Sequence, residues 1–152
     1  MPRSAARRVV ELVHIREEFS AVWPGMKEEA GEFGVKMNEM PKVVVSSTLT
    51  DPEWENTSVI SGDDLPAEVG RLKAQYDGDI LVAGSARLAN ALREQDLVDE
   101  YRLMVHPVVL GGGKRLFEGG TPTDLELIES RQAGPDVLLL TLRPARAETT
   151  EN

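Results

Sequence analysis

The chain has 152 residues, the length of one ordinary domain, and its 26 acidic and 17 basic residues give a net charge of −9. That balance argues against a nucleic-acid partner, and no apolar run is long enough to predict a membrane span. The absence of cysteine and the presence of only two histidines, His14 and His106, exclude disulfides, thiolate metal sites, cysteine nucleophiles and a histidine-rich metal centre.

The residues at the two ends of the chain bear on targeting and on order. The apolar stretch that begins at Val9 is interrupted by Glu11 and His14, so we expect no secretory signal, although the arginines near the start leave a transit peptide open. Residues 144–152 are polar, and we expect them to form a disordered tail.

The first half of the chain predicts two strands and a helix. Three consecutive valines within 42–46 indicate a buried strand of a parallel sheet, and a second strand is expected at 58–60. Asp63 or Asp64 then offers a helix cap, and Pro66 suits the first turn. Apolar residues recur on one face of this helix until the turn at 77–79.

The second half predicts a strand over 80–83, a helix that runs to about Gln95, and a longer strand over 101–110. The glycines at 111–113 break that strand, and residues 125–128 and 137–142 indicate an antiparallel hairpin. Strands that alternate with helices predict an α/β domain with a mostly parallel sheet and an antiparallel edge.

The turn between the strand at 80–83 and the next helix carries the strongest chemical signal. Gly84 and Ser85 open a helix whose first amides have no partner inside the helix, and such a turn can bind a phosphate. The alternative, a plain tight turn that holds no ligand, stays open, because one glycine does not make a dinucleotide fingerprint.

A second polar cluster, Ser46, Ser47 and Thr48, follows the strand at 42–46. Its hydroxyls could bind a phosphate or a ribose, or they could simply cap the end of the strand. Both clusters are expected at the same edge of the sheet, since the carboxyl ends of parallel strands meet there.

Other candidates have ordinary structural explanations. The glycines at 111–113 with Lys114 and Arg115 lack phosphate-loop spacing and predict a wide turn. We expect His106 to lie in a strand with a structural role. Packing is the expected role of Trp23 and Trp54, and capping or solvation that of Asp96, Asp99 and Glu100.

The run GDILVAGSARLANALREQDLVDEYRLMVHPVVLGGGKRLF, residues 78–117, resembles the C-terminal reductase domain of bifunctional riboflavin-biosynthesis proteins. It is still more similar to stand-alone bacterial members of the dihydrofolate reductase superfamily that share this domain. MPKVVVSSTL at 40–49, the segment at 54–60 and FSAVWPG at 19–25 extend the resemblance over residues 19–143.

The resemblance implies a dihydrofolate-reductase-like three-layer fold, with helices on both faces of a mostly parallel sheet and an antiparallel C-terminal hairpin. It also implies NADPH as cofactor, a small-molecule substrate, a homodimer and a cytoplasmic location. The residues that it assigns to the cofactor are Ser46, Ser47, Thr48, Gly84, Ser85, Ala86, Arg87 and Leu88.

The chain departs from this family at three places. Many relatives carry an arginine, which would bind a 2′-phosphate, where this chain has Ser47. Riboflavin-type reductases commonly hold their pyrimidine with a glutamate where this chain has Val82, so we do not expect the riboflavin intermediate itself as substrate. Residues 1–18 do not resemble the family's opening strand, loop and helix. We therefore expect a shortened chain, a substitute helix over 3–18, or a partner that covers the gap.

These observations leave three hypotheses for the function. The first is an NADPH-dependent reductase, similar to 5-amino-6-(5-phosphoribosylamino)uracil reductase, that transfers hydride to a pterin- or pyrimidine-like substrate; we assign it no catalytic residue. The second is a nucleotide-binding or oligomerisation module without activity. The third is a structural fragment that binds nothing.

Overall fold

The computed structural model describes residues 10–13, 30–82 and 84–145, with backbone alone for 10–13 and Phe33. His14, Trp23 and the segment 19–25 lie outside the described residues. The chain divides into two compact units, residues 1–91 and 92–152.

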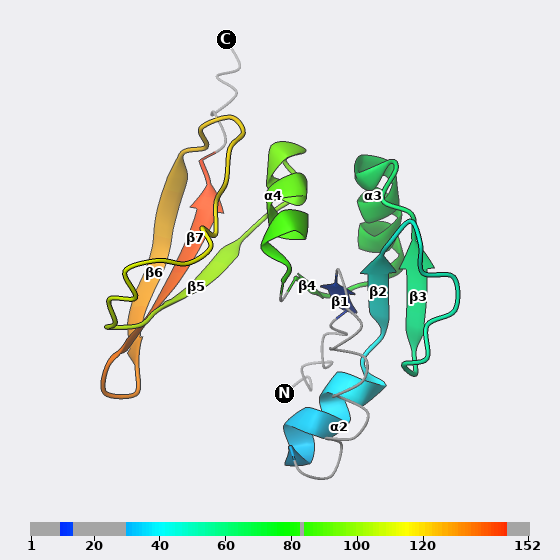
Figure 1. Cartoon of the computed structure of the whole chain (residues 1–152), viewed down its shortest axis with the longest axis horizontal. Helices are drawn as coiled ribbons and strands as arrows, with labels where there is room; N and C mark the ends of the chain where they lie inside the picture. The colour runs from blue at the N-terminus through cyan, green and yellow to red at the C-terminus, as the bar shows by residue number, and fades with distance from the viewer. Residues whose placement is uncertain (1–9, 14–29, 83, 146–152) are drawn as a thin grey trace, which may run out of the picture. The chain divides into compact units, whose positions relative to one another are not determined.

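The first unit is built on a four-stranded parallel sheet with the order β3-β2-β1-β4. Figure 1 shows β2 and β3 running in the same direction. The strands are β1 (Val10–Val13), β2 (Lys42–Val45), β3 (Thr57–Ile60) and β4 (Ile80–Leu81). The helices of this part are α2 (Gly31–Glu39), α3 (Leu65–Gln75) and α4 (Ala86–Glu94), which ends in the second unit.

The position of β1 corrects the expectation that a central strand is missing. Val10–Val13 pairs in parallel with β2 on one side and with β4 on the other, so residues 10–13 form a strand and not a substitute helix. The predicted boundaries of the domain, 19–143 between the segments 1–18 and 144–152, stay predictions.

The core of the first unit lies along β2 and α3. Val43 and Val44 are almost fully buried in the centre of the sheet, as the valine run predicts. Val69 and Leu72 are buried on the predicted face of α3, and Asp64 caps that helix by accepting a hydrogen bond from the amide of Ala67 at 3.2 Å. Both predictions are therefore confirmed.

The second unit is a three-stranded antiparallel sheet with the order β5-β7-β6. Its strands are β5 (Tyr101–Val105), β6 (Leu125–Ala133) and β7 (Val137–Pro144). The predicted hairpin is confirmed, but β5 pairs with β7, so these strands form a sheet of their own and not the edge of the parallel one.

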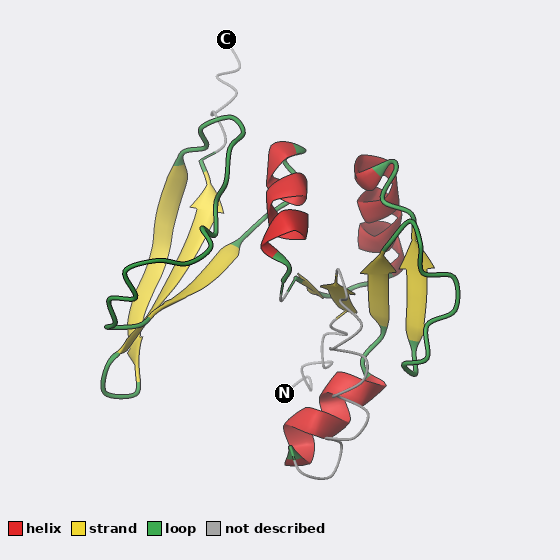
Figure 2. Cartoon of the chain, viewed as in Figure 1, coloured by secondary structure: helices red, strands yellow, loops and turns green. Residues whose placement is uncertain are grey.

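Two predicted strands are shorter than expected. β5 ends at Val105 and not at Leu110, because Pro107 has no amide hydrogen for the ladder and restricts the residue before it. His106 is consequently an exposed loop residue and not part of a strand. β4 ends at Leu81, and Figure 2 shows a long segment without helix or strand between β5 and β6.

No helix among the described residues is long and apolar enough to cross a membrane.

Candidate functional site

The carboxyl ends of the four parallel strands form one edge of the first unit. The chain passes from β1 to β2 and β3 on one side, and then returns to place β4 on the other side of β1. The strand order therefore reverses between β1 and β4. Ligands of open α/β sheets bind at the carboxyl edge beside such a reversal.

The turn after β4 leaves backbone accessible at this edge. Gly84 has φ +135°, a region that favours glycine, and a Cβ atom built there meets no heavy atom within 4 Å. The Gly84–Ser85 peptide is cis. The turn thus presents open backbone directly before α4.

The first turn of α4 has a defined cap and open amides. The hydroxyl of Ser85 accepts a hydrogen bond from the amide of Leu88 at 3.4 Å, and the Ser85 carbonyl accepts from Ala89 at 3.0 Å. The amides of Ala86 and Arg87 lie where the helix itself supplies no acceptor. They carry the partial positive charge of a helix N-terminus, to which the exposed Arg87 adds a full charge. Leu88 is buried, with its amide bonded to Ser85.

Of the residues after β2, Ser46 closes a local turn, Thr48 contacts it through its amide and its hydroxyl, and Ser47 has no such contact among the hydrogen bonds of this turn. The Ser46 hydroxyl accepts hydrogen bonds from the amides of Thr48 at 3.3 Å and Leu49 at 3.1 Å, so it closes its own turn. This is the capping role left open by the sequence. Ser47 and Thr48 are exposed at the edge.

The sheet brings the two predicted clusters to the same edge, on either side of β1. The clusters follow β2 and β4, and β1 pairs with both of these strands. Two interstrand spacings, about 10 Å, therefore separate the strand ends that carry them.

Sequence reasoning missed a buried carboxylate at this edge. Glu68, 9% exposed, accepts a hydrogen bond from the Ser61 hydroxyl at 3.2 Å and another from the Gly62 amide at 3.0 Å. Gly62 has φ +79°, and a Cβ there would lie 2.6 Å from a side-chain carbon of Val45. The sequence signal that could have indicated this contact is the position of Glu68, one helical turn after the predicted cap Asp64.

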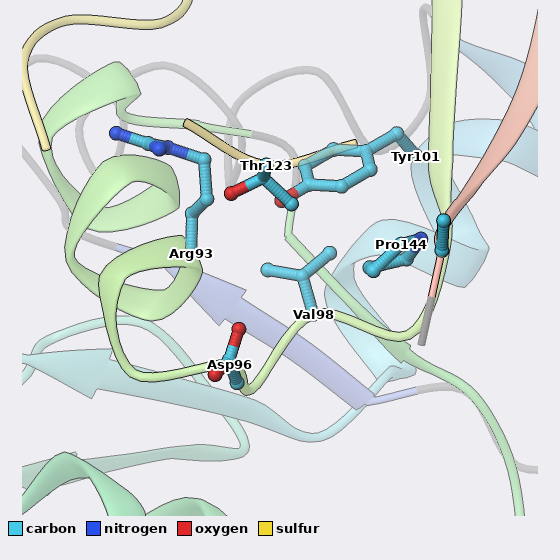
Figure 3. A pocket seen from close by; sticks show the side chains of 7 residues that line it. Arg93, Asp96, Val98, Tyr101, Thr123 and Pro144 are labelled. Atoms are coloured by element: carbon cyan, nitrogen blue, oxygen red, sulfur yellow. The ribbon is translucent and has the colours of Figure 1, made fainter. Parts of the chain in front are cut away.

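The second unit contains a cavity of about 390 Å³, seen from close by in Figure 3. Its lining comprises Arg93, Asp96, Val98, Tyr101, Thr123, Pro144 and Ala145. Arg93 donates hydrogen bonds to the carbonyls of Gly119 at 2.7 Å and Thr121 at 3.0 Å, so the loop after β5 holds its guanidinium. The lining includes none of the predicted cofactor residues.

Tyr101 packs edge-on against Phe117 beside this cavity, with ring centres 5.6 Å apart. Burial raises the pKa of the Tyr101 hydroxyl above its ordinary value, the positive charge of Arg93 opposes that rise, and the negative charge of Asp96 adds to it. The Tyr101 ring therefore serves as a packing group beside the cavity.

Asp96, Trp54 and Glu100 take the structural roles expected of them. Asp96, at φ +52°, ends α4: its amide donates to the carbonyl of Arg93 and that of Leu97 donates to Leu92. Trp54 is buried. Glu100 accepts hydrogen bonds from Arg102 and Arg143, which hold the pKa of its carboxyl below the usual value.

Comparison with known proteins identifies relatives of this architecture. The model of the RibD C-terminal domain family matches residues 9–139. The Bacillus subtilis proteins YyaP and YwjB, both of uncharacterised function, are 43% identical over 68 residues and 40% identical over 74 residues. These matches cover 45% and 48% of this chain, but 36% and 42% of the relatives' own lengths.

Solved structures share the fold at low sequence identity. A candidate riboflavin biosynthesis protein from Shewanella sp. PV-4 has a TM-score of 0.67 at 17% identity, over 92% of this chain and 75% of that one. RibD from Acinetobacter baumannii has a TM-score of 0.62 at 14% identity, over 92% of this chain and 47% of that one. The predicted dihydrofolate-reductase-like α/β fold is therefore confirmed. Since the family model matches most of the chain, the chain belongs to the RibD C-terminal domain family.

Proposed function

We propose that this chain is a reductase that binds a reduced nicotinamide nucleotide and serves a pterin- or pyrimidine-like substrate. The observation that carries the proposal is the open Gly84–Ser85 turn before α4, at the point where the strand order reverses. NADPH is the cofactor expected from the family, and it would supply hydride for a C=N or C=O group.

The residues of the edge fit the pyrophosphate of such a cofactor. Gly84 leaves room for a phosphate to approach the backbone, and the amides of Ala86 and Arg87 offer donors with partial positive charge. The exposed Arg87 guanidinium adds a charged donor. Ser47 and Thr48 offer hydroxyls for a ribose at a distance of two strands.

Val82 bears on the choice of substrate. This residue directly follows β4 and is half-buried, and its side chain accepts no hydrogen bond from a pyrimidine ring. We therefore propose a substrate related to, but different from, the pyrimidine intermediate of riboflavin biosynthesis.

One observation favours a second candidate, a nucleotide-binding module without turnover. Glu68 is the one buried carboxylate among the residues whose side chains the structure describes. Its oxygens accept hydrogen bonds from Ser61 and Gly62, so its role is to hold the turn after β3. A module of this kind would bind the nucleotide at the phosphate turn without catalysing hydride transfer.

Two experiments distinguish the reductase from the module. Calorimetric titration with NADPH and NADH measures cofactor binding. Absorbance assays of nicotinamide oxidation, with dihydropterins and aminopyrimidinones as substrates, measure turnover. Binding with turnover supports the reductase, and binding without turnover of any substrate favours the module. A chain that binds neither cofactor would overturn both proposals and leave a structural role.

Two further proposals concern the chain's surroundings. We propose a homodimer, supported by the apolar side chains of Val109 and Leu110, which are 97% and 79% exposed. We also propose a cytoplasmic location, for which the absence of cysteine is the support.

A further inference from the structure

The loops that follow β2 and β3 contain no basic residue. Residues 46–64 include no lysine, arginine or histidine, whereas they include five acids: Asp51, Glu53, Glu55, Asp63 and Asp64. Every residue of this stretch is described by the structure. The stretch therefore offers no charged donor to a bound anion, and its acids add negative charge.

Part of this negative charge lies beside the candidate ribose site. The Ser46 amide donates to the carbonyl of Ile60 at 2.9 Å, which continues the pairing of β2 with β3 to the edge. Close packing of Gly62 against Val45 holds the next turn beside the end of β2. That turn carries the exposed Asp63 and Asp64 to the same edge as Ser47.

The basic side chains that the structure describes in this unit lie outside these loops. Lys42 stands at the opposite end of β2, where its ammonium donates to the carbonyls of Met37, Asn38 and Met40. Arg71 lies in the second turn of α3, and Arg87 follows β4, two strands away from β2.

We propose that the site prefers a nicotinamide nucleotide whose adenosine ribose carries a free 2′-hydroxyl, NADH rather than NADPH. This inference rests on the proposed function and concerns the ribose end of the same site. Among the described residues, those of the turn before α4 fit the pyrophosphate, whereas the loops after β2 and β3 offer no positive charge for a 2′-phosphate.

The physical reason is the charge of the extra phosphate. A phosphate monoester carries a charge of about −1.5 to −2 at neutral pH. It would lie at the same edge as the exposed carboxylates of Asp63 and Asp64, the second of which also caps α3. A free 2′-hydroxyl can instead donate a hydrogen bond to a carboxylate. Dinucleotide-binding sheets use an acid for the free hydroxyl and an arginine for the phosphate. Repulsion between the 2′-phosphate and these carboxylates predicts that NADH binds at least about tenfold more tightly than NADPH.

The test is calorimetric titration of the full chain with NADH and with NADPH, in the parent and in three variants of exposed residues. Ser47→Arg supplies a bidentate phosphate donor and should shift the preference toward NADPH by about tenfold. Asp63→Asn removes one negative charge at the edge and should reduce the preference for NADH over NADPH. Glu55→Gln, the matched control, removes one charge at the amino end of β3 and should leave the ratio of the two affinities unchanged.

The outcomes separate this inference from the function on which it rests. Tighter binding of NADH, with the expected shifts in Ser47→Arg and Asp63→Asn, supports the inference. Equal affinities, or tighter binding of NADPH by the parent, overturn the preference while the nucleotide site stands. Failure to bind either cofactor overturns the proposed function itself, and with it the preference.

Discussion

The ammonium of Lys42 lies 4.5 Å from the centre of the Trp54 ring. Lys42 is only 1% exposed, and its three hydrogen bonds satisfy carbonyls at and just after the end of α2. Trp54 in turn donates through Nε1 to the Asn38 side chain at 2.8 Å. A buried cation thus joins the end of α2 to β2 and to the loop before β3.

Replacement of Lys42 by methionine keeps most of the volume but removes the donors and the charge. We expect Lys42→Met to lower the free energy of unfolding by about 2–4 kcal/mol, since buried carbonyls lose their partners and the cation–π contact is lost. Urea denaturation measures this loss. Lys36→Met, at an exposed position of α2, is the control; an equal loss in both variants would refute the capping role.

Two variants of Ser85 test the phosphate turn by charge alone. Asp and Asn both cap helices well, so Ser85→Asp and Ser85→Asn should keep the start of α4. The aspartate carboxylate would repel the pyrophosphate, and we expect Ser85→Asp to bind NADH about tenfold more weakly than Ser85→Asn, or worse. Calorimetry measures the NADH affinity of both variants. Equal affinities would show that the pyrophosphate does not bind at this turn.

Glu68 is expected to hold the turn after β3 through both of its oxygens. In Glu68→Gln the amide nitrogen would face a donor, so we expect a loss of about 1–2 kcal/mol in the free energy of unfolding. Ser61→Ala should lower the free energy of unfolding by less than Glu68→Gln does. If the contact is real, the double variant loses less than the sum of the two single losses.

The ion pairs of Glu100 predict a dependence of stability on pH. Arg102 donates at 2.7 Å and Arg143 at 3.1 Å, and these hydrogen bonds lower the pKa of the Glu100 carboxyl in the folded chain. Its contribution to stability is therefore present above the ordinary carboxyl pKa and is lost as the pH falls through the lowered folded value.

We expect the stability difference between the parent and Glu100→Gln to be small at neutral pH, because both arginine partners are exposed, and to vanish in acid. Unfolding in urea at several pH values measures it. Glu53→Gln is the control in the first unit. A difference that persists at the lowest pH would show that the side chain acts through packing and not through charge.

The homodimer proposal predicts that a charge at Val109 weakens association. This side chain is 97% exposed, so Val109→Lys should leave the fold of the chain intact. Sedimentation velocity of the parent should show a dimer, and the variant should dissociate at higher concentrations than the parent does. Ala74→Lys adds the same charge on α3 as a control. A monomeric parent would end the proposal.

The sequence predicted the elements that are determined by interactions between residues close together in the chain. The valine run of β2, the apolar face and Asp64 cap of α3, and the hairpin of β6 and β7 are recovered because periodicity and turn chemistry act within a few residues. The two predicted site clusters share one edge, since parallel strands place their carboxyl ends together.

The sequence missed the elements that contacts from elsewhere stabilise. α2 starts without a side-chain cap at Ala30, and the carbonyls at its end are satisfied by Lys42, which lies beyond the helix. Glu11 interrupts the apolar residues of β1, and this strand is defined by its pairing with β2 and β4. Neither element carries a strong signal in its own residues.

The central place of β1 also constrains the order in which the chain can fold. Val10 pairs with Ile80, so the ladder between β1 and β4 joins residues far apart in sequence. During synthesis, β1 and β2 can meet early, whereas the edge that carries Gly84 is completed only after β4 has left the ribosome. A chain stalled before Ile80 would therefore expose one unpaired side of β1, an open strand edge that favours aggregation.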